Sequence, residues 1–85
     1  MVIYTMTVGQ AVAKRVNDLL VKNDMTQYRL AKETLISHNT ITSIVNAKNK
    51  SASLNTIFLI CRAFNITIDE FFGDPVFKNV EIEVD

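Results

Sequence analysis

Apolar positions recur with a helical period over most of the chain, from residue 8 to residue 72. In the first stretch they are three or four positions apart: Val8, Val12, Val16, Leu19 and Leu20. This spacing places them on one face of a helix. We therefore expect an α-helix over Val8–Lys22, ended by Asn23 and Asp24, which favour turns.

Two short helices are expected next, with a two-residue turn between them. Thr26 can cap a helix over Gln27–Thr34, because its hydroxyl can accept a backbone N–H of the first turn. Ser37 can cap a second helix over residues 38–46 in the same way. So short a connection forces the two helices to cross steeply. The apolar residues expected to face the core are Leu30, Ala31, Ile41, Ile44 and Val45.

A fourth helix is predicted over residues 54–64, with Ser53 as its N-cap. Its expected core face consists of Leu54, Ile57, Phe58, Cys61 and Phe64. Leu59 and Ile60 are extra apolar positions outside that stripe. Asn65 is a suitable residue after the helix because Asn tolerates the left-handed conformation.

A fifth, short helix is predicted over Ile68–Phe72. Thr67 and Glu70 have the spacing of a capping box, in which each side chain bonds to the backbone N–H of the other. Gly73 and Pro75 then end the helix.

The two ends of the chain have a β-like pattern, in residues 2–4 and in residues 80–84. A single short strand is not stable alone. Three alternatives stay open: the two ends pair with each other, the tail pairs across a dimer, or the tail is unpaired. The chain therefore divides into an N-terminal extension (1–7), a helical domain (8–73) and an acidic tail (74–85).

Composition indicates one folded domain, since 48% of the 85 residues are hydrophobic and 21% are charged. The formal net charge is zero, but it is unevenly distributed. Residues 1–65 hold eight Lys/Arg and three Asp/Glu, a balance of +5, and residues 66–85 hold one and six, a balance of −5. A basic body with an acidic tail fits nucleic-acid binding and ordinary surface solubility equally well.

Several function classes are excluded or disfavoured. One His and one Cys cannot supply the four ligands of a structural zinc site, and one Cys cannot form an internal disulfide. The longest apolar run, residues 57–61, is too short to span a bilayer, and the first residues lack the basic region of a signal peptide. No catalytic constellation or phosphate-binding glycine loop is evident, and the capping box explains the adjacent carboxylates Asp69 and Glu70. We expect a cytoplasmic protein that is not an enzyme and has no cofactor, metal or membrane contact.

The outward face of the third helix carries the candidate chemistry. It consists of uncharged residues that can form hydrogen bonds: His38, Asn39, Thr40, Thr42, Ser43 and Asn46. A solvated helix face usually carries Lys and Glu, which are better helix formers, so helix stability does not explain this composition. Asn can pair with adenine in the major groove, and Thr or Ser can bond to base edges. The pattern favours a DNA-reading helix.

Residues 26–46, TQYRLAKETLISHNTITSIVN, and the later segment 53–72 resemble the helix-turn-helix domain of the phage lambda-repressor/Cro family, also called the xenobiotic-response-element family. The resemblance covers about residues 8–72. It implies an all-α, compact five-helix lambda-repressor-like DNA-binding domain, here with short β-like ends. Leu35 and Ala47 depart from the pattern, because glycine is usual in the turn and frequent after the recognition helix. A left-handed backbone there costs a residue with a side chain roughly 1 kcal/mol.

The resemblance also implies roles for single residues. Those matched to base contacts are His38, Asn39 and Ser43, with Thr42 as a further candidate. Those assigned to phosphate contacts are Gln27, Thr40, Asn46, Lys48 and Lys50. For Thr40 the alternative is support of the helix start, and for the two lysines it is plain solvation in a loop.

Two functions are consistent with these observations. The first is a sequence-specific transcriptional regulator, a repressor that binds an inverted-repeat operator in double-stranded DNA as a homodimer, with its two recognition helices roughly 34 Å apart. The second is an antitoxin-like protein-interaction module with secondary DNA binding. The weak net charge, the alternating acidic tail and the extra apolar pair Leu59 and Ile60 favour it. Its protein partner would bind through the C-terminal tail, as a strand added to a sheet edge.

Overall fold

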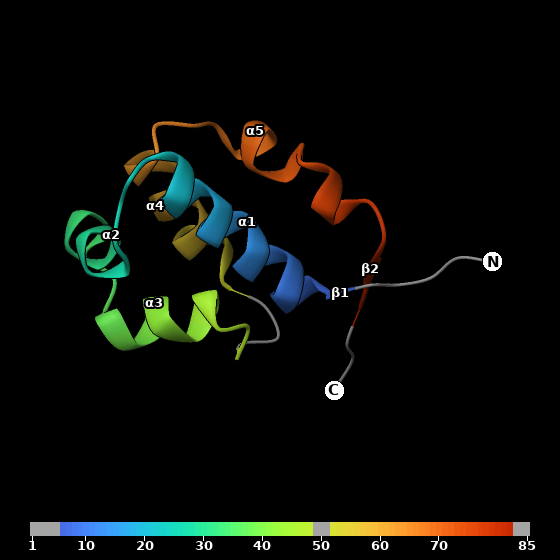
Figure 1. Cartoon of the computed structure of the whole chain (residues 1–85), viewed down its shortest axis with the longest axis horizontal. Coiled ribbons are helices and arrows are strands. Elements are labelled where there is room, and N and C mark those ends of the chain that lie inside the picture. Colours follow the sequence, from blue (N-terminus) through green and yellow to red (C-terminus); the bar gives the residue numbers. More distant parts are fainter. Residues whose placement is uncertain (1–5, 49–51, 83–85) are drawn as a thin grey trace.

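The computed structural model describes residues 6–48 and 52–82, and in that part of the chain it contains five α-helices (Figure 1). Their bounds are α1 Val8–Lys22, α2 Gln27–Thr34, α3 His38–Val45, α4 Leu54–Ala63 and α5 Ile68–Phe72. A 3-10 helix, η1 (Pro75–Phe77), and two short strands, β1 (Met6–Thr7) and β2 (Val80–Glu81), complete it. The predicted all-α class is confirmed, with α3 and α4 each one residue shorter than expected because Asn46 and Phe64 are their C-caps.

The helices begin where the sequence supplies a capping hydroxyl. Thr26, Ser37 and Ser53 each accept a hydrogen bond from the backbone N–H three residues later, at 3.1–3.2 Å. The capping box of Thr67 at the start of α5 is also present. Thr7 forms a second capping box at the start of α1, which was not predicted.

Left-handed residues end or follow the first four helices. They are Asp24, Leu35, Ala47 and Asn65, with φ of 52°, 62°, 57° and 58°. After α3 the Lys48 N–H donates to the Ser43 carbonyl at 2.8 Å, and the Ala47 N–H donates to the Ile44 carbonyl at 3.1 Å. This pair of bonds is the Schellman motif, which satisfies carbonyls that the helix end leaves free. The expected left-handed geometry of Leu35 is confirmed.

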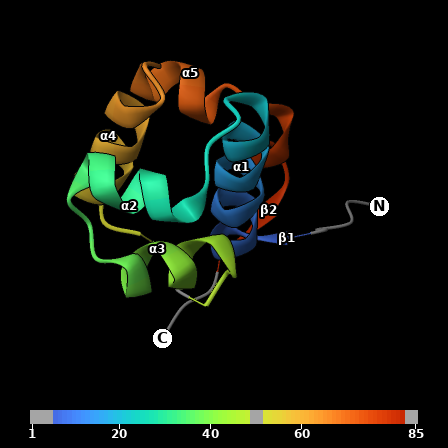
Figure 2. The ribbon, with the colours of Figure 1, turned by 60° about the vertical axis from the view of Figure 1, so that its left-hand side comes forward.

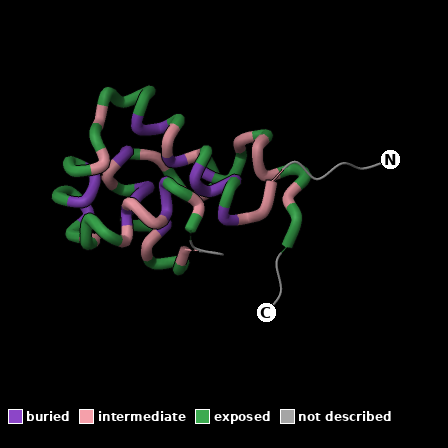
Figure 3. The backbone as a smooth tube through the Cα atoms, turned by 60° about the horizontal axis from the view of Figure 1, so that its bottom comes forward, coloured by how far each residue is buried: buried purple, intermediate pink, exposed green. Residues whose placement is uncertain are grey.

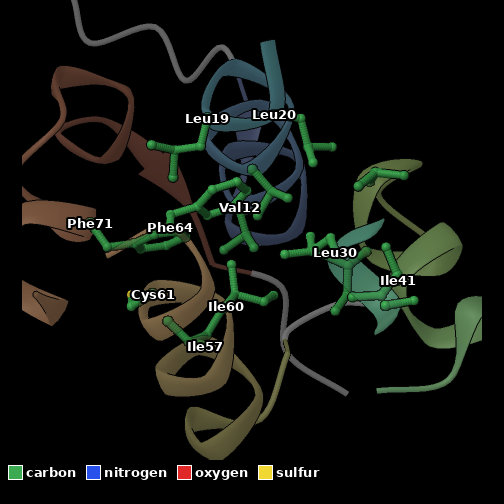
Figure 4. Packing of buried hydrophobic residues seen from close by; sticks show 14 residues of the cluster. Val12, Leu19, Leu20, Leu30, Ile41, Ile57, Ile60, Cys61, Phe64 and Phe71 are labelled. Carbon is green, nitrogen blue, oxygen red and sulfur yellow. The ribbon is translucent and has the colours of Figure 1, made fainter. Parts of the chain in front are cut away.

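Each of the five helices contributes one large, fully buried side chain to a single core: Val16, Leu30, Ile41, Ile60 and Phe71. Figure 4 shows Val12 of α1 between the Leu30–Ile41 side of this core and the Phe64–Phe71 side. Buried and exposed stretches accordingly alternate along the chain in Figure 3.

The predicted core face of α4 was wrong at three positions. Leu54 and Phe58 are 64% and 48% exposed, whereas Ile60, placed outside the stripe, is fully buried. Apolar residues occupy nearly every side of α4, so periodicity alone does not identify the buried face. The position of α4 against the other helices decides it.

The two ends of the described chain pair with each other. Met6 lies opposite Val80 and Thr7 opposite Glu81 in a parallel two-stranded sheet. Val80 and Glu81 of the predicted tail strand therefore pair with the N-terminal side of the chain, but at Met6 and Thr7 and not within the predicted residues 2–4. Residues 2–4 and 83–84 lie outside the described part. Between α5 and β2, Phe77 packs against the core, with its ring centroid 4.9 Å from that of Phe72.

Arg15 of α1 connects this C-terminal segment to the helical core. Its Nε donates to the Phe71 carbonyl at 2.8 Å and its Nη2 donates to the Glu70 carbonyl at 2.9 Å. Its Nη1 lies 3.5 Å from the Asp74 carboxylate. One guanidinium therefore holds the end of α5 and the residue before η1. None of the described helices has the length and apolar content needed to cross a membrane.

Candidate nucleic-acid interface

The recognition-helix candidate α3 lies on one side of the bundle, and α5 lies on the opposite side (Figures 1 and 2). Ile41, Ile44 and Val45 turn one face of α3 into the core. The opposite face of α3 is therefore directed away from the protein.

Most of the predicted polar residues lie on or beside that outward face. At 100° per residue, Asn39, Ser43 and Asn46 lie near its centre. Thr42 lies along one flank and Thr40 along the other, whereas His38, at the first position of α3, lies beyond Thr42 toward the side of Val45. Side chains of three of them are exposed (His38, Asn39 and Asn46), and those of Thr40, Thr42 and Ser43 are half-buried. The structure thus places five of them on α3 and the sixth, Asn46, at its C-cap.

The start of α3 is fixed by a pair of hydroxyl groups. Ser37 Oγ accepts the Thr40 N–H at 3.2 Å and donates its own proton to Thr40 Oγ1 at 2.8 Å. Thr40 therefore does support the helix start. Its hydroxyl proton is still able to donate to a phosphate, and that role stays a prediction.

The end of α3 is fixed by Asn17 of α1, a residue that the sequence analysis missed. Its side-chain amide donates to the Ala13 carbonyl at 2.8 Å and to the Val45 carbonyl at 3.0 Å. The second bond satisfies one of the last carbonyls of α3, which have no partner within the helix. A signal was present, since Asn17 is a polar residue at the edge of the buried stripe, four positions after Ala13 and three before Leu20.

Two of the predicted phosphate ligands lie on elements outside α3. Gln27 is half-buried at the first position of α2, where backbone N–H groups and the helix dipole favour an anion. Lys48 is exposed directly after the Schellman motif that ends α3. Lys50 lies outside the described residues.

Two residues of α2 next to α3 were also missed. Tyr28 is 64% exposed, and its ring meets that of His38 edge-on with centroids 6.4 Å apart. The Lys32 ammonium lies 5.8 Å from the centroid of the Tyr28 ring. The available signal was an aromatic residue at a position of α2 outside its buried face.

The single cysteine does not add reactive chemistry. Cys61 is buried on the core face of α4. Burial raises the pKa of its thiol, with Arg15 acting in the opposite direction. The thiol is therefore protonated at neutral pH and fills space in the core, since the thiolate is the reactive form.

Three comparisons with known proteins agree with this geometry. The profile of the Cro/C1-type HTH DNA-binding domain matches residues 15–75. An uncharacterized SPbeta prophage-derived HTH-type transcriptional regulator, YopO of Bacillus subtilis (strain 168), is 32% identical over 62 residues, 73% of this chain and 87% of that protein. The crystal structure of the prophage Lp1 protein 11 superposes with a TM-score of 0.77 over 89% of this chain and 100% of that one. At 22% identity, this last match shows a shared fold.

Proposed function

Because the chain belongs to the family of Cro/C1-type helix-turn-helix DNA-binding domains, we propose that it is a transcriptional repressor that binds double-stranded DNA as a homodimer. One observation carries this proposal above the others. The outward face of α3 presents uncharged hydrogen-bonding side chains, while Ser37 and Asn17 fix its two ends. A rigid helix with such a face can read base edges in the major groove.

The proposed roles divide by position on and around α3. Asn39 and Ser43, at the centre of the outward face, read base edges together with Thr42 on its flank and His38 at the first position of α3. The residues proposed to contact phosphates are Gln27, Thr40, Asn46, Lys48 and Lys50. Phosphate contacts set the register of the protein on DNA, and base contacts set the preferred sequence.

Dimerisation is proposed because one recognition helix reads too few base pairs to define an operator. An exposed apolar surface on α4, consisting of Leu54, Phe58 and Leu59, supports a partner chain. Two of these residues, Phe58 and Leu59, also line a hollow of about 690 Å³ that extends to Ile66 and Ile68. A second copy that covers this surface would give the two-fold symmetry of an inverted-repeat operator. We also propose that it acts in the cytoplasm, together with the DNA that it would bind.

Selection from a random pool of double-stranded DNA at two salt concentrations tests this proposal. We expect enrichment of an inverted repeat whose half-sites lie about ten base pairs apart. Weak binding that depends on salt but enriches no sequence would contradict it. Light scattering on the same preparation gives the oligomeric state independently of DNA.

An antitoxin-like module is the second candidate, and the exposed α4 surface favours it if the chain is a monomer. The partner would then be another protein, through this surface or through the C-terminal tail. A monomer by light scattering, together with no enriched DNA sequence, would favour this second candidate over the repressor. A dimer with an enriched inverted repeat would exclude it as the main function.

A further inference from the structure

Tyr28 is an exposed aromatic residue beside the reading helix that the roles above do not use. It lies on α2 and is 64% exposed, whereas the buried face of that helix consists of Leu30, Ala31 and Thr34. The core therefore does not account for an aromatic side chain at this position.

Two neighbours hold the Tyr28 ring. On one side it meets the His38 ring at 6.4 Å between centroids and an interplanar angle of 61°, an edge-on geometry that aromatic pairs prefer. The Lys32 ammonium, one helical turn further along α2, lies 5.8 Å from the ring centroid, within the range of a cation–π contact. The ring is thus in contact with its own helix and with α3.

The partner on α3 is one of the proposed base-reading residues. His38 is the first residue of α3, and recognition helices place their N-terminal residues on base edges. An exposed side chain at a helix start is free to adopt several rotamers, and ordering it on binding reduces affinity. A neighbour that orders His38 before DNA arrives removes part of that loss.

We propose that Tyr28 is a specificity-determining positioning residue, which fixes the His38 ring for the reading of one base pair in each half-site. Lys32 holds the Tyr28 ring from α2. This inference rests on the proposed function, because it assigns a role in the recognition of DNA by α3. It makes the start of the recognition surface a pair of side chains from two helices.

The test compares DNA selection by the wild-type chain, His38→Ala, Tyr28→Ala and the double variant. His38→Ala is expected to lose preference at one base pair of the half-site. Tyr28→Ala should lose preference at that same base pair, with about a two- to tenfold loss of affinity. The double variant should bind no more weakly than His38→Ala, because Tyr28 acts through His38.

Two matched variants separate positioning from a general effect. Tyr28→Phe keeps the ring and should retain the wild-type preference. Arg29→Ala removes a side chain from another face of α2, where it lies 3.4 Å from Glu33, and should leave the base preference unchanged. In the DNA-free wild-type protein, nuclear Overhauser contacts between the Tyr28 and His38 rings are expected. This measurement does not depend on the folding of any alanine variant.

Three results would overturn the inference. One is an unchanged preference of Tyr28→Ala at the base pair that His38→Ala affects, and another is an additive loss in the double variant. The third is the absence of contacts between the two rings in the wild-type spectrum. If the wild-type chain itself selects no sequence, the proposed function fails. If the wild-type chain selects an operator and one of the three results above is obtained, only this inference fails, so the two failures are distinguishable.

Discussion

Four residues with side chains hold the left-handed backbone conformation in the described part of the chain, and neither glycine does. Asp24 and Asn65 have short polar side chains that tolerate this region. Leu35 and Ala47 do not, and each carries a cost of about 1 kcal/mol or more. Leu35 lies in the turn between α2 and α3, so the strain is located next to the candidate DNA site.

Leu35→Gly is therefore expected to stabilise the protein by about 0.5–1 kcal/mol, because relief of the left-handed strain exceeds the added entropy of the unfolded chain. The Leu35 side chain is 92% exposed, so its removal sacrifices little packing. Urea unfolding measures the change. Leu35→Ala is the matched control, which removes the side chain but keeps the strain, and equal effects of the two variants would contradict this explanation.

Asn39 lies at the centre of the outward face of α3 and has the side chain best suited to pair with adenine. Asn39→Ala should weaken specific binding by about 1–3 kcal/mol and relax preference at one base pair. Band shifts on the selected operator and on single-base variants measure both effects. Asn79→Ala, an exposed asparagine near β2, serves as the control. If Asn39→Ala leaves both affinity and base preference unchanged, Asn39 is not one of the base-contacting residues.

At the scale of single elements, most local determinants could be predicted from the sequence, although the capping box of Thr7 and Gln10 was missed. Thr26, Ser37, Ser53 and Thr67 cap backbone groups only three residues away, so their helices could be predicted from neighbouring residues. The buried face of α4 could not, because it depends on which neighbours the helix meets. The contacts of Asn17 with α3 and of Tyr28 with His38 join different elements, and local periodicity contains no information on such pairs.

The Glu70 carboxylate at the start of α5 should make the stability of the protein decrease at acidic pH. Thr67 donates its N–H and its hydroxyl to Glu70 Oε1, both at 2.9 Å. The backbone bond first, and then the hydroxyl bond, lower the pKa of Glu70 below its ordinary value of 4.5. A carboxyl with a lowered folded-state pKa stabilises the fold fully above pH 4.5, and this contribution is lost as the pH falls through the folded-state value.

Glu70→Gln should therefore flatten the decrease in melting temperature between about pH 5 and about pH 3. Glutamine keeps an acceptor for the Thr67 N–H, as Gln10 does for Thr7 at the start of α1, but it does not titrate. Thermal unfolding followed by circular dichroism at several pH values measures the slope. An acid dependence identical to that of the wild-type chain would show that this capping box does not contribute to it.

At the scale of the whole molecule, DNA affinity should depend on a few cations around α3, because α3 itself carries no charged residue. Lys48→Ala should weaken binding to all sequences and reduce the salt dependence by about one phosphate contact. Lys78→Ala, at an exposed lysine between η1 and β2, changes the net charge by the same amount as Lys48→Ala and is the matched control. A salt slope equal to that of the wild-type chain would remove Lys48 from the phosphate contacts.

Substitution of Arg15 should change the stability of the protein without changing its DNA-binding surface. Its guanidinium donates to two carbonyls at the end of α5, and its side chain is only 16% exposed. Lysine keeps the charge next to Asp74 but cannot reproduce both bonds, since it lacks the planar fork. Arg15→Lys is therefore expected to lower the free energy of unfolding by about 1–2 kcal/mol.

The adjacent Lys14 gives the comparison, because it forms an exposed ion pair with Asp18 at 3.0 Å. Lys14→Ala should change the free energy of unfolding by no more than about 0.5 kcal/mol. Since α5 and α3 lie on opposite sides of the bundle, Arg15→Lys should leave operator affinity within about twofold of wild type under conditions where the variant is folded. A large loss of affinity in the folded variant would mean that the anchor of α5 also sets the geometry of α3.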